Sequence, residues 1–291
     1  MKMVHDRLEE RGCPFYFLNH ADIDETTVDI DFGSMTGVLA SPSGECPVEE
    51  LGSFYYRPYD LRHYPHIQPV SNDNAALLPY YMVEKSIWMM SELSGGLIVN
   101  PQEASASNQS KPVQAALIKK AGFEIPDTLI TSVPKEVLAF EKKHGRIIYK
   151  SISAARSIVK VFGREDKERL DDIRHLPVQF QQFVEGTDYR VHIVGDRGFT
   201  AKIVSDSDDY RYGDATVESA ELPEDVREKC FRLSRGLGLI VCGIDLRVDL
   251  AGQWYCLEVN PSPGFSYYEA HTGQPVSAAI AELLHTGLKD Q

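Results

Sequence analysis

Two alternating segments near the C-terminus constrain this chain more than any other feature. Residues 243–249 (Gly-Ile-Asp-Leu-Arg-Val-Asp) and 254–261 (Trp-Tyr-Cys-Leu-Glu-Val-Asn-Pro) alternate apolar and polar side chains, with Gly252 between them. This pattern is typical of an antiparallel hairpin built from half-buried strands. With Ala251-Gly252 as the turn, the register pairs Asp245 with Glu258, Arg247 with Cys256 and Asp249 with Trp254.

The register also predicts what each face of the hairpin carries, because side chains alternate along a strand. The buried face would hold Ile244, Leu246, Val248, Tyr255, Leu257 and Val259. The other face would hold Asp245, Arg247, Glu258 and Asn260. Two opposed carboxylates cost energy unless a cation lies between them. Asp and Glu carboxylates with an Asn carbonyl oxygen are ligands for a hard divalent ion such as Mg²⁺ at a phosphoryl-transfer centre. An exposed polar hairpin face is the alternative.

Composition places the chain among globular proteins and excludes several classes of function. Its 291 residues are 43% apolar, which is enough for two or three small domains. The net charge of −13, without a basic block, disfavours non-specific binding to nucleic acid or to a membrane. Five scattered cysteines, none in a CxxC pair, indicate free thiols rather than disulfides or zinc. We therefore expect a cytoplasmic protein with no secretion signal or membrane span.

The order of elements predicts an α/β part followed by α+β parts. Residues 1–12 indicate a helix and residues 14–18 a strand, and a first strand before that helix is expected to be missing. Further helices are predicted over 74–93, 112–121, 134–144, 223–237 and 275–288, and further strands over 36–40, 53–57, 97–100, 128–131, 147–150, 157–161, 178–183, 189–194 and 199–204. The predicted domains are 1–104 (α/β), 105–185 (central lobe) and 186–291 (C-terminal lobe with the metal site).

Three weaker signals point to an anionic ligand. Lys111 begins a predicted helix, where unpaired N–H groups favour phosphate, and Lys150 ends an apolar strand before a small-residue loop, 151–157. That loop has no glycine, and the chain has no GxxxxGK[ST] motif. Residues 180–190 indicate a strand, a hinge and a second strand, where a hinge can bind an adenine edge. Surface lysines and an ordinary linker are the alternatives.

In combination these segments resemble the ATP-grasp superfamily, and most of all its RimK-like branch of ATP-dependent carboxylate–amine ligases. The resemblance covers about two thirds of the chain, from Leu97 to Leu284, and rests on this order: Lys111, Tyr149-Lys150, Gln181-Gln182-Phe183-Val184, Asp188-Tyr189-Arg190-Val191, Gly243-Ile244-Asp245 and Glu258-Val259-Asn260-Pro261-Ser262-Pro263-Gly264. Three further segments are similar to ligases that crosslink ribosomally made peptides: 55–58, 209–211 and 268–276. The resemblance implies an ATP-grasp fold, in which an N-terminal α/β lobe precedes two α+β lobes that clasp ATP.

The resemblance also implies residue roles. Lys111 and Lys150 would contact the ATP phosphates, Gln181, Gln182, Phe183 and Val184 would line the adenine pocket, and Asp188 would reach the ribose. Asp245, Glu258 and Asn260 would hold one or two Mg²⁺ ions, with Mn²⁺ as an alternative. The catalytic cations would be Arg190, which steadies the transferred phosphate, and Lys202 on the next strand.

The implied reaction transfers the γ-phosphoryl group of ATP to a carboxylate, and an amine or hydroxyl then attacks the acyl-phosphate. Partners would be amino-acid, peptide or small-molecule substrates, and related ligases often form homo-oligomers. Candidates for gripping a substrate are Arg57, Arg62, Arg211 and Arg247, with a structural salt bridge as the alternative for each. A regulatory ATP-binding scaffold and a small-molecule kinase of the same fold are the competing functions.

Overall fold

The computed structural model describes residues 1–57, 60–106, 110–150, 159–205 and 215–287. Contacts divide the chain into two compact units. Unit 1 comprises Met1–Gln102 and Pro275–Gln291, and unit 2 comprises Glu103–Gln274. The C-terminal helix therefore groups with the N-terminal segment. The division at 104 and 185 stays a prediction.

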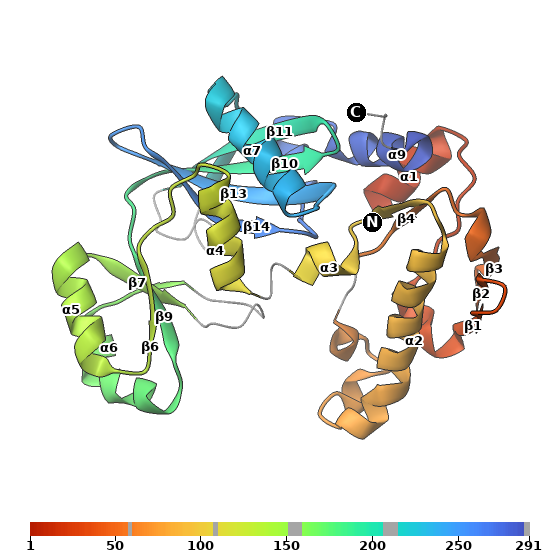
Figure 1. The fold of residues 1–291 in the computed structure, drawn as a ribbon, viewed down its shortest axis with the longest axis horizontal. Coiled ribbons are helices and arrows are strands. Elements are labelled where there is room, and N and C mark those ends of the chain that lie inside the picture. The colour runs from red at the N-terminus through yellow and green to blue at the C-terminus, as the bar shows by residue number, and fades with distance from the viewer. Residues whose placement is uncertain (58–59, 107–109, 151–158, 206–214, 288–291) are drawn as a thin grey trace. The chain divides into compact units, whose positions relative to one another are not determined.

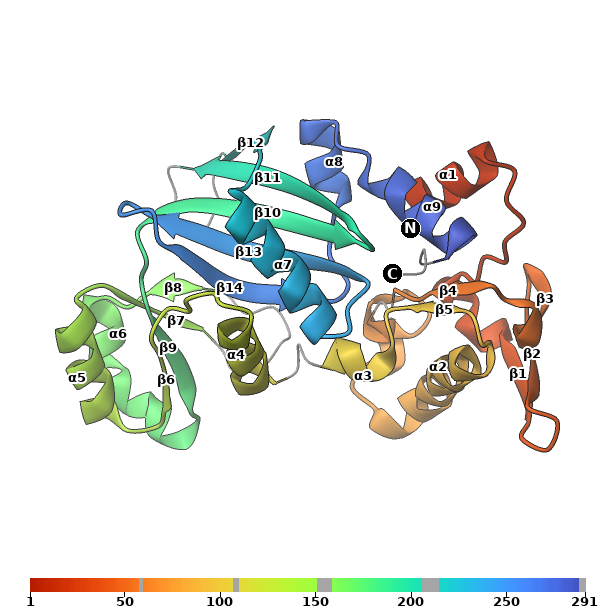
Figure 2. The same ribbon diagram turned by 45° about the horizontal axis from the view of Figure 1, so that its top comes forward.

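Unit 1 combines helices with two small sheets (Figure 1). Its elements are α1 (Lys2–Glu10), β1 (Thr27–Asp31), β2 (Thr36–Ser41), β3 (Gly44–Pro47), β4 (Ser53–Tyr55), α2 (Asn74–Leu93), β5 (Leu97–Val99) and α9 (Val276–Thr286). Strands β1, β2 and β3 pair antiparallel, whereas β4 and β5 pair in parallel. Helix α2 has the predicted bounds and contributes Ile87, Trp88 and Met90 to the core beneath β2. Helix α1 lies beside α9 (Figure 2).

The strand predicted at 14–18 is wrong, and no strand is assigned to those described residues. Phe15 and Phe17 instead pack edge-on against the ring of His5 on α1, with ring centroids 4.9 and 5.3 Å away. Both phenylalanines remain partly exposed. The segment lacks a neighbouring strand to satisfy its backbone, so apolar alternation alone does not make it a strand.

Unit 2 begins with a helical segment and a small sheet, called here the central sheet (Figure 1). The elements are α3 (Gln102–Ser105, which starts in unit 1), α4 (Lys111–Lys120), β6 (Thr128–Thr131), α5 (Pro134–His144), β7 (Ile147–Lys150), β8 (Lys160–Val161), α6 (Arg164–Glu168) and β9 (Val178–Gln182). The strand order is β6-β9-β7-β8. One face packs Ile147, Phe162 and Phe180 against Val137 of α5. Helix α5 has the predicted bounds, and Gly145, at a φ of 74°, directly follows its last residue.

The second sheet of unit 2, called here the C-terminal sheet, carries the predicted hairpin. Its elements are β10 (Gly186–Val194), β11 (Arg197–Ser205), β12 (Ala215–Ser219), α7 (Glu224–Gly236), β13 (Val241–Asp249), β14 (Trp254–Asn260) and α8 (Ser266–Thr272). The order is β12-β11-β10-β13-β14, and every pairing is antiparallel. Helix α7 lies across this sheet (Figure 2), and Leu233 packs with Ile244 and Leu246. Burial of this face leaves the opposite face for polar side chains.

The hairpin register is correct at one end and wrong at the other. Asp245 opposes Glu258 as predicted, but Arg247 opposes Tyr255 rather than Cys256, and Trp254 opposes Val248 rather than Asp249. A β-bulge shifts the register between Asp245 and Leu246. The extra residue places Cys256 in the core and leaves Tyr255 and Leu257 only partly buried, contrary to the prediction. Val248, also predicted on the buried face, is only partly buried as well.

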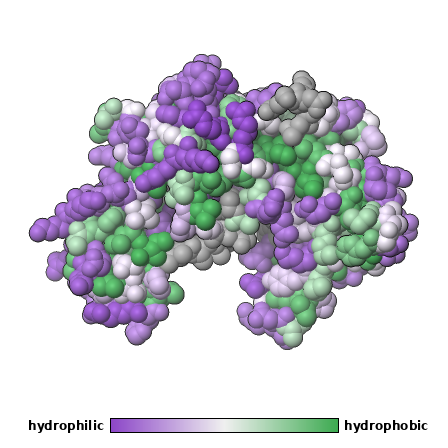
Figure 3. Space-filling model, in the orientation of Figure 1, coloured by the Kyte–Doolittle hydropathy of each residue, from purple (hydrophilic) through white to green (hydrophobic). Residues whose placement is uncertain are grey.

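The surface is mixed in character. On the face drawn in Figure 3, hydrophilic residues surround smaller apolar patches. Within the described part of the chain, none of the helices has the length and apolar character needed to cross a membrane.

Candidate active site

Two of the three predicted metal ligands, Asp245 on β13 and Glu258 on β14, are direct cross-strand neighbours. Each is paired with a different cation. Arg190 Nη1 donates to Asp245 Oδ1 at 2.6 Å, and Lys111 Nζ forms an ion pair with Glu258 Oε1. Asn260, opposite Gly243, lies on the same face. The hairpin therefore presents two carboxylates and an amide beside two basic groups.

Arg190 is buried, with its side chain 6% exposed. Its guanidinium occupies space that a side chain at Gly243 would fill. A Cβ on Gly243 would overlap that guanidinium and lie 2.7 Å from Pro263 Cβ, so a side chain there would force Arg190 or Pro263 to shift. His192, two residues along β10, contacts the Gly264 carbonyl through Nε2 at 3.1 Å. These contacts hold the turn after β14 against the arginine.

Burial raises the pKa of the Asp245 carboxyl above its ordinary value, while the charge and hydrogen bond of Arg190 oppose the rise. The Asp245 side chain is still 24% exposed, so a ligand can reach it. Carboxylate and amide oxygens are the hard donors that Mg²⁺ prefers. The donor set therefore fits this ion chemically.

Lys111 reaches Glu258 because α4 is fixed to β14 by a residue that the sequence argument missed. Gln114 Nε2 donates to the Val259 carbonyl at 2.9 Å, and the Val259 N–H donates to Gln114 Oε1 at 3.1 Å. Gln114 follows Lys111 by three residues, so the two share one side of the helix. A polar residue one turn after the lysine was the available sequence signal.

Most of the residues predicted to bind nucleotide line a single pocket of about 1000 Å³, counting its open part. We call it the nucleotide pocket. It lies between the central sheet and the C-terminal sheet, both within unit 2. Its walls include Lys150, Gln181, Gln182, Phe183, Val184, Asp188, Asp245, Arg247 and Glu258. The loop 151–157 after Lys150 lies outside the described residues.

The hinge of this pocket is held by Arg247. Its guanidinium donates to both carboxylate oxygens of Asp188, at 2.7 and 2.6 Å, and to the Val184 carbonyl at 2.9 Å. It also lies 5.6 Å from the centroid of the Phe183 ring, whose other neighbour, Arg146, is 4.0 Å away. The structure contains the alternative that the sequence left open for Arg247, an ion pair with Asp188. A contact between Arg247 and a substrate stays a prediction.

Other predicted residues are not brought to the carboxylate pair. Lys202 opposes Tyr189 on β10 and Glu218 on β12, with Glu218 Oε1 at 3.2 Å. It therefore lies on the sheet face opposite Arg190, which pairs with Ala201.

The remaining candidates for gripping a substrate lie outside unit 2 or outside the described residues. Arg57 and Arg62 belong to unit 1, where Arg57 donates to the Tyr55 hydroxyl at 3.2 Å. Arg211 falls within a segment that is not described.

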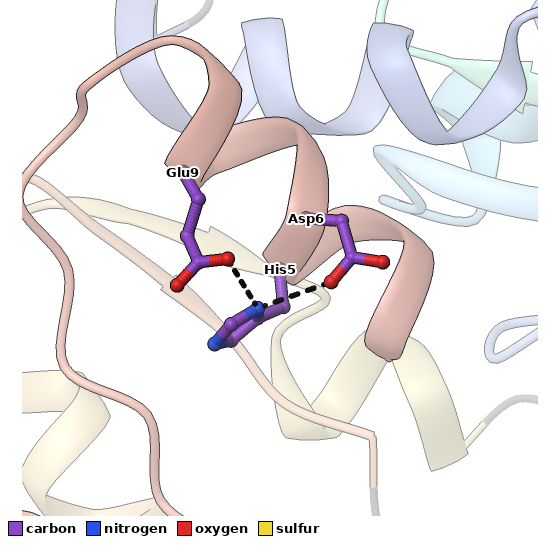
Figure 4. Close-up of side chains that lie close together, drawn as sticks. All are labelled: His5, Asp6 and Glu9. Carbon is purple, nitrogen blue, oxygen red and sulfur yellow. Dashed lines mark hydrogen bonds and ion pairs between the residues drawn. The ribbon is translucent and has the colours of Figure 1, made fainter.

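A separate cluster of His5, Asp6 and Glu9 lies on α1 (Figure 4). His5 Nδ1 is 3.4 Å from Asp6 Oδ1 and 3.6 Å from Glu9 Oε2. Lys2 Nζ already pairs with Asp6 at 2.8 Å. The cluster belongs to unit 1 and shares no residue with the nucleotide pocket.

Comparison with known proteins agrees with this geometry. A family model described as a RimK-like ATP-grasp domain matches residues 106–284. A probable alpha-L-glutamate ligase of Trichodesmium erythraeum (strain IMS101) is 28% identical over 211 residues, covering 68% of this chain and 70% of the relative. Another, of Teredinibacter turnerae (strain ATCC 39867 / T7901), is 24% identical over 240 residues, covering 78% and 79%.

Solved structures extend the likeness to nearly the whole chain. The ATP-grasp ligase PsnB, complexed with a phosphomimetic variant of a minimal precursor, Mg and ADP, matches with a TM-score of 0.84 at 25% identity, covering 99% of this chain and 94% of that chain. The macrocyclase MdnC from Microcystis aeruginosa MRC, bound with precursor peptide MdnA, has a TM-score of 0.83 at 23% identity, covering 97% and 94%. The predicted ATP-grasp fold is confirmed.

Proposed function

We propose, from the premise that this chain belongs to the RimK-like ATP-grasp family and is an ATP-dependent carboxylate–amine ligase, that its substrate is a peptide. A side-chain carboxylate of the peptide would be activated as an acyl-phosphate. An amine or hydroxyl would then attack the acyl carbon and release phosphate. The products would be an amide or ester crosslink, ADP and inorganic phosphate.

The choice of a peptide rests on how much of the chain each likeness covers. The match to PsnB, which is complexed with a minimal precursor, extends over 99% of this chain. The match to the Trichodesmium glutamate ligase covers 68%. The likeness to a ligase solved with a precursor therefore takes in unit 1 as well as unit 2.

The proposed nucleotide contacts follow the geometry of the pocket. Gln181, Gln182, Phe183 and Val184 would bind adenine at the hinge, where backbone groups and an apolar wall meet. Asp188 would accept from the ribose while it keeps its hydrogen bonds to Arg247. The ammonium groups of Lys150 and Lys111 would contact the phosphates.

Asp245, Glu258 and Asn260 would hold Mg²⁺, or Mn²⁺ in its place. The ion would supply a Lewis acid that neutralises charge on the phosphoryl oxygens. Arg190 and Lys111 contact the two carboxylates in the structure, and in this proposal they would also contact the phosphoryl oxygens of ATP. A preorganised cation beside the reacting phosphate lowers the barrier without rearrangement. The register of β11 gives no support for the same role at Lys202.

One observation carries the nucleotide and metal part of the proposal: two opposed carboxylates, each beside its own cation, line the same pocket as the hinge at 181–184. A nucleotide triphosphate and its metal need this combination of hard oxygens, cations and an apolar wall.

Trapping with hydroxylamine tests the reaction and the substrate class together. The protein is incubated with ATP, Mg²⁺ and hydroxylamine, and either an acidic peptide or free glutamate. We expect ADP and a peptide hydroxamate, and far less product from glutamate. A hydroxamate of glutamate alone would overturn the peptide assignment. Phosphorylated product without hydroxamate would indicate a kinase, and nucleotide binding without turnover would indicate a scaffold.

A further inference from the structure

A second pocket lies within unit 2, between α4, the strands β6 and β9, and β14. We call it the α4 pocket. It shares Pro126, Lys150, Gln181 and Leu257 with the nucleotide pocket, whereas Ala115 and Ile118 of α4 line only the α4 pocket. The two pockets therefore adjoin through these shared residues, and residues of α4 line only the second pocket.

Gln179 on β9 is the feature of this pocket that calls for a ligand. It is 4% exposed, and its Oε1 is a buried atom that has no hydrogen-bond partner within the described ranges. Its neighbour Phe180 packs into the core with α5, so the Gln179 side chain points to the opposite face, towards the pocket. A buried acceptor costs stability unless a donor reaches it.

The other buried amides of the pocket have partners. Gln114 holds the backbone of Val259, and Gln181 Nε2 donates to Thr128 Oγ1 at 3.0 Å. Gln179 is therefore distinct among the three glutamines that line this pocket.

Basic side chains outnumber acidic ones in the wall of the pocket, even though Lys111 is already paired with Glu258. Lys111, Lys119 and Lys150 line it, and the acidic side chain among the lining residues, Asp127, accepts from Lys143 Nζ at 2.9 Å. The walls are otherwise largely apolar, including Ile118 and Ile130. An occupant must match three features: a negative charge, an apolar body and a hydrogen-bond donor.

We propose that the α4 pocket binds a small carboxylate with a branched apolar side chain and an amide N–H, the chemistry of an N-acylated amino acid. The carboxylate faces the lysines, the side chain packs against Ala115 and Ile118, and the N–H donates to Gln179 Oε1. Each group meets the part of the wall that complements it.

Binding in the α4 pocket opposes binding of nucleotide phosphates, since the two sites share cations. Lys150 lines both pockets, and Lys111 lines the α4 pocket while it contacts Glu258 at the carboxylate pair. A carboxylate in the α4 pocket draws these ammonium groups away from the nucleotide. Coupling of this kind is reciprocal, so bound ADP lowers the affinity for the carboxylate ligand by the same factor.

The test measures binding of N-acetyl-L-leucine to the full chain by calorimetry, with N-acetyl-L-leucine amide as the control ligand. We expect the acid to bind and the amide, which lacks the charge, to bind at least tenfold more weakly. Equal binding of the two, or no binding of the acid, would overturn the proposal.

Two substitutions on α4 locate the site. Ala115 lines the pocket, whereas Ala116 is exposed and does not. Ala115→Phe fills the pocket and should abolish binding, and Ala116→Phe should leave it unchanged. Gln179→Leu removes the acceptor without adding bulk and should weaken binding severalfold, which keeps the test valid if Ala115→Phe unfolds. Unchanged binding in Gln179→Leu would contradict the assignment.

Nucleotide competition distinguishes the α4 pocket from the nucleotide pocket. Adenosine has no phosphates and should leave the affinity for N-acetyl-L-leucine unchanged, whereas ADP with Mg²⁺ should reduce it. Displacement by adenosine would place the probe in the nucleotide pocket and overturn the proposal, and no effect of ADP would overturn the coupling. Because these measurements need no turnover, their failure is distinguishable from failure of the proposed ligase reaction.

Discussion

Asp245 and Glu258 oppose each other across β13 and β14, and each forms an ion pair with a cation from another element. Arg190 comes from the neighbouring strand β10 and Lys111 from the start of α4. Two adjacent carboxylates would otherwise repel, and these two cations offset the repulsion. The same four side chains can therefore serve a phosphoryl-transfer site without a change of fold.

Removal of Arg190 should destabilise the protein through Asp245. Arg190→Ala leaves a partly buried carboxylate without its cation, and we expect a loss of about 2–4 kcal/mol in the free energy of unfolding. Asp245→Asn in that background removes the charge and should restore much of the loss. Urea unfolding of the single and double variants measures this. Equal stability of the two variants would show that the ion pair does not hold Asp245.

Gly243 should tolerate no side chain, because a Cβ there meets Arg190 and Pro263. Gly243→Ala should cost about 1–3 kcal/mol, as overpacking does, and should reduce kcat by displacing the guanidinium. The matched control is Gly236→Ala at the end of α7, where the added Cβ has no neighbour within 4 Å. That control should be neutral or slightly stabilising. A Gly243→Ala enzyme with normal stability and kcat would contradict the packing argument.

Much of the fold follows from local sequence signals. Asp73 accepts from the N–H groups of Ala75 and Ala76, which caps α2 where its apolar pattern begins. The bulge in β14 was not predictable in this way. Cys256 and Leu257 are both apolar, so either register buries an apolar side chain. The choice depends on the packing of Cys256 against α7 and α4, which is tertiary information.

The site was predictable only where it depends on local sequence patterns. Alternation gives the Asp245–Glu258 pair directly, but the cations come from positions 55 and 147 residues away. The face of Lys202 could have been inferred. The turn at Gly195-Asp196 pairs Val194 with Arg197, which places Lys202 opposite Tyr189 and away from Arg190.

Replacement of Arg247 by lysine should loosen the hinge of the nucleotide pocket and weaken ATP binding. Arg247 forms a bidentate pair with Asp188 and also binds the Val184 carbonyl, and lysine cannot make all three contacts. Since both side chains are over four-fifths buried, we expect the KM for ATP to rise about tenfold, with a smaller change in kcat. Steady-state kinetics at saturating second substrate measure the split.

The matched control for Arg247→Lys is Arg227→Lys, which alters an exposed pair with Glu224. It should change neither stability nor KM, since exposed pairs contribute little. A KM effect of similar size in both variants would rule out a specific role for the hinge.

The pH dependence of stability should change at Glu84 in unit 1. Burial raises the pKa of the Glu84 carboxyl, although a hydrogen bond from the Tyr56 hydroxyl at 3.1 Å opposes the rise. The folded state therefore takes up a proton more readily than the unfolded state. The stabilisation of the folded state by protonated Glu84 is fully present below the ordinary pKa of 4.5. It is lost as the pH rises through the raised pKa.

Glu84→Gln keeps an acceptor for Tyr56 and removes the titration. The variant should gain stability relative to the parent at neutral pH, and the gain should shrink as the pH falls through the raised pKa of Glu84 and be lost below 4.5. Thermal melting of both proteins across this range measures the difference. A difference that does not vary with pH would show that Glu84 is not the titrating group.

The central claim is that the opposed carboxylates hold the metal for phosphoryl transfer. The rate of ADP formation, with saturating ATP, Mg²⁺ and peptide, tests it in Asp245→Asn and Glu258→Gln, with the exposed Glu224→Gln as control. The account predicts a fall of roughly a thousandfold or more in both variants and no change in the control, while a cooperative thermal melt above the assay temperature shows that each variant is still folded. Turnover within a few-fold of the parent in either variant would contradict it.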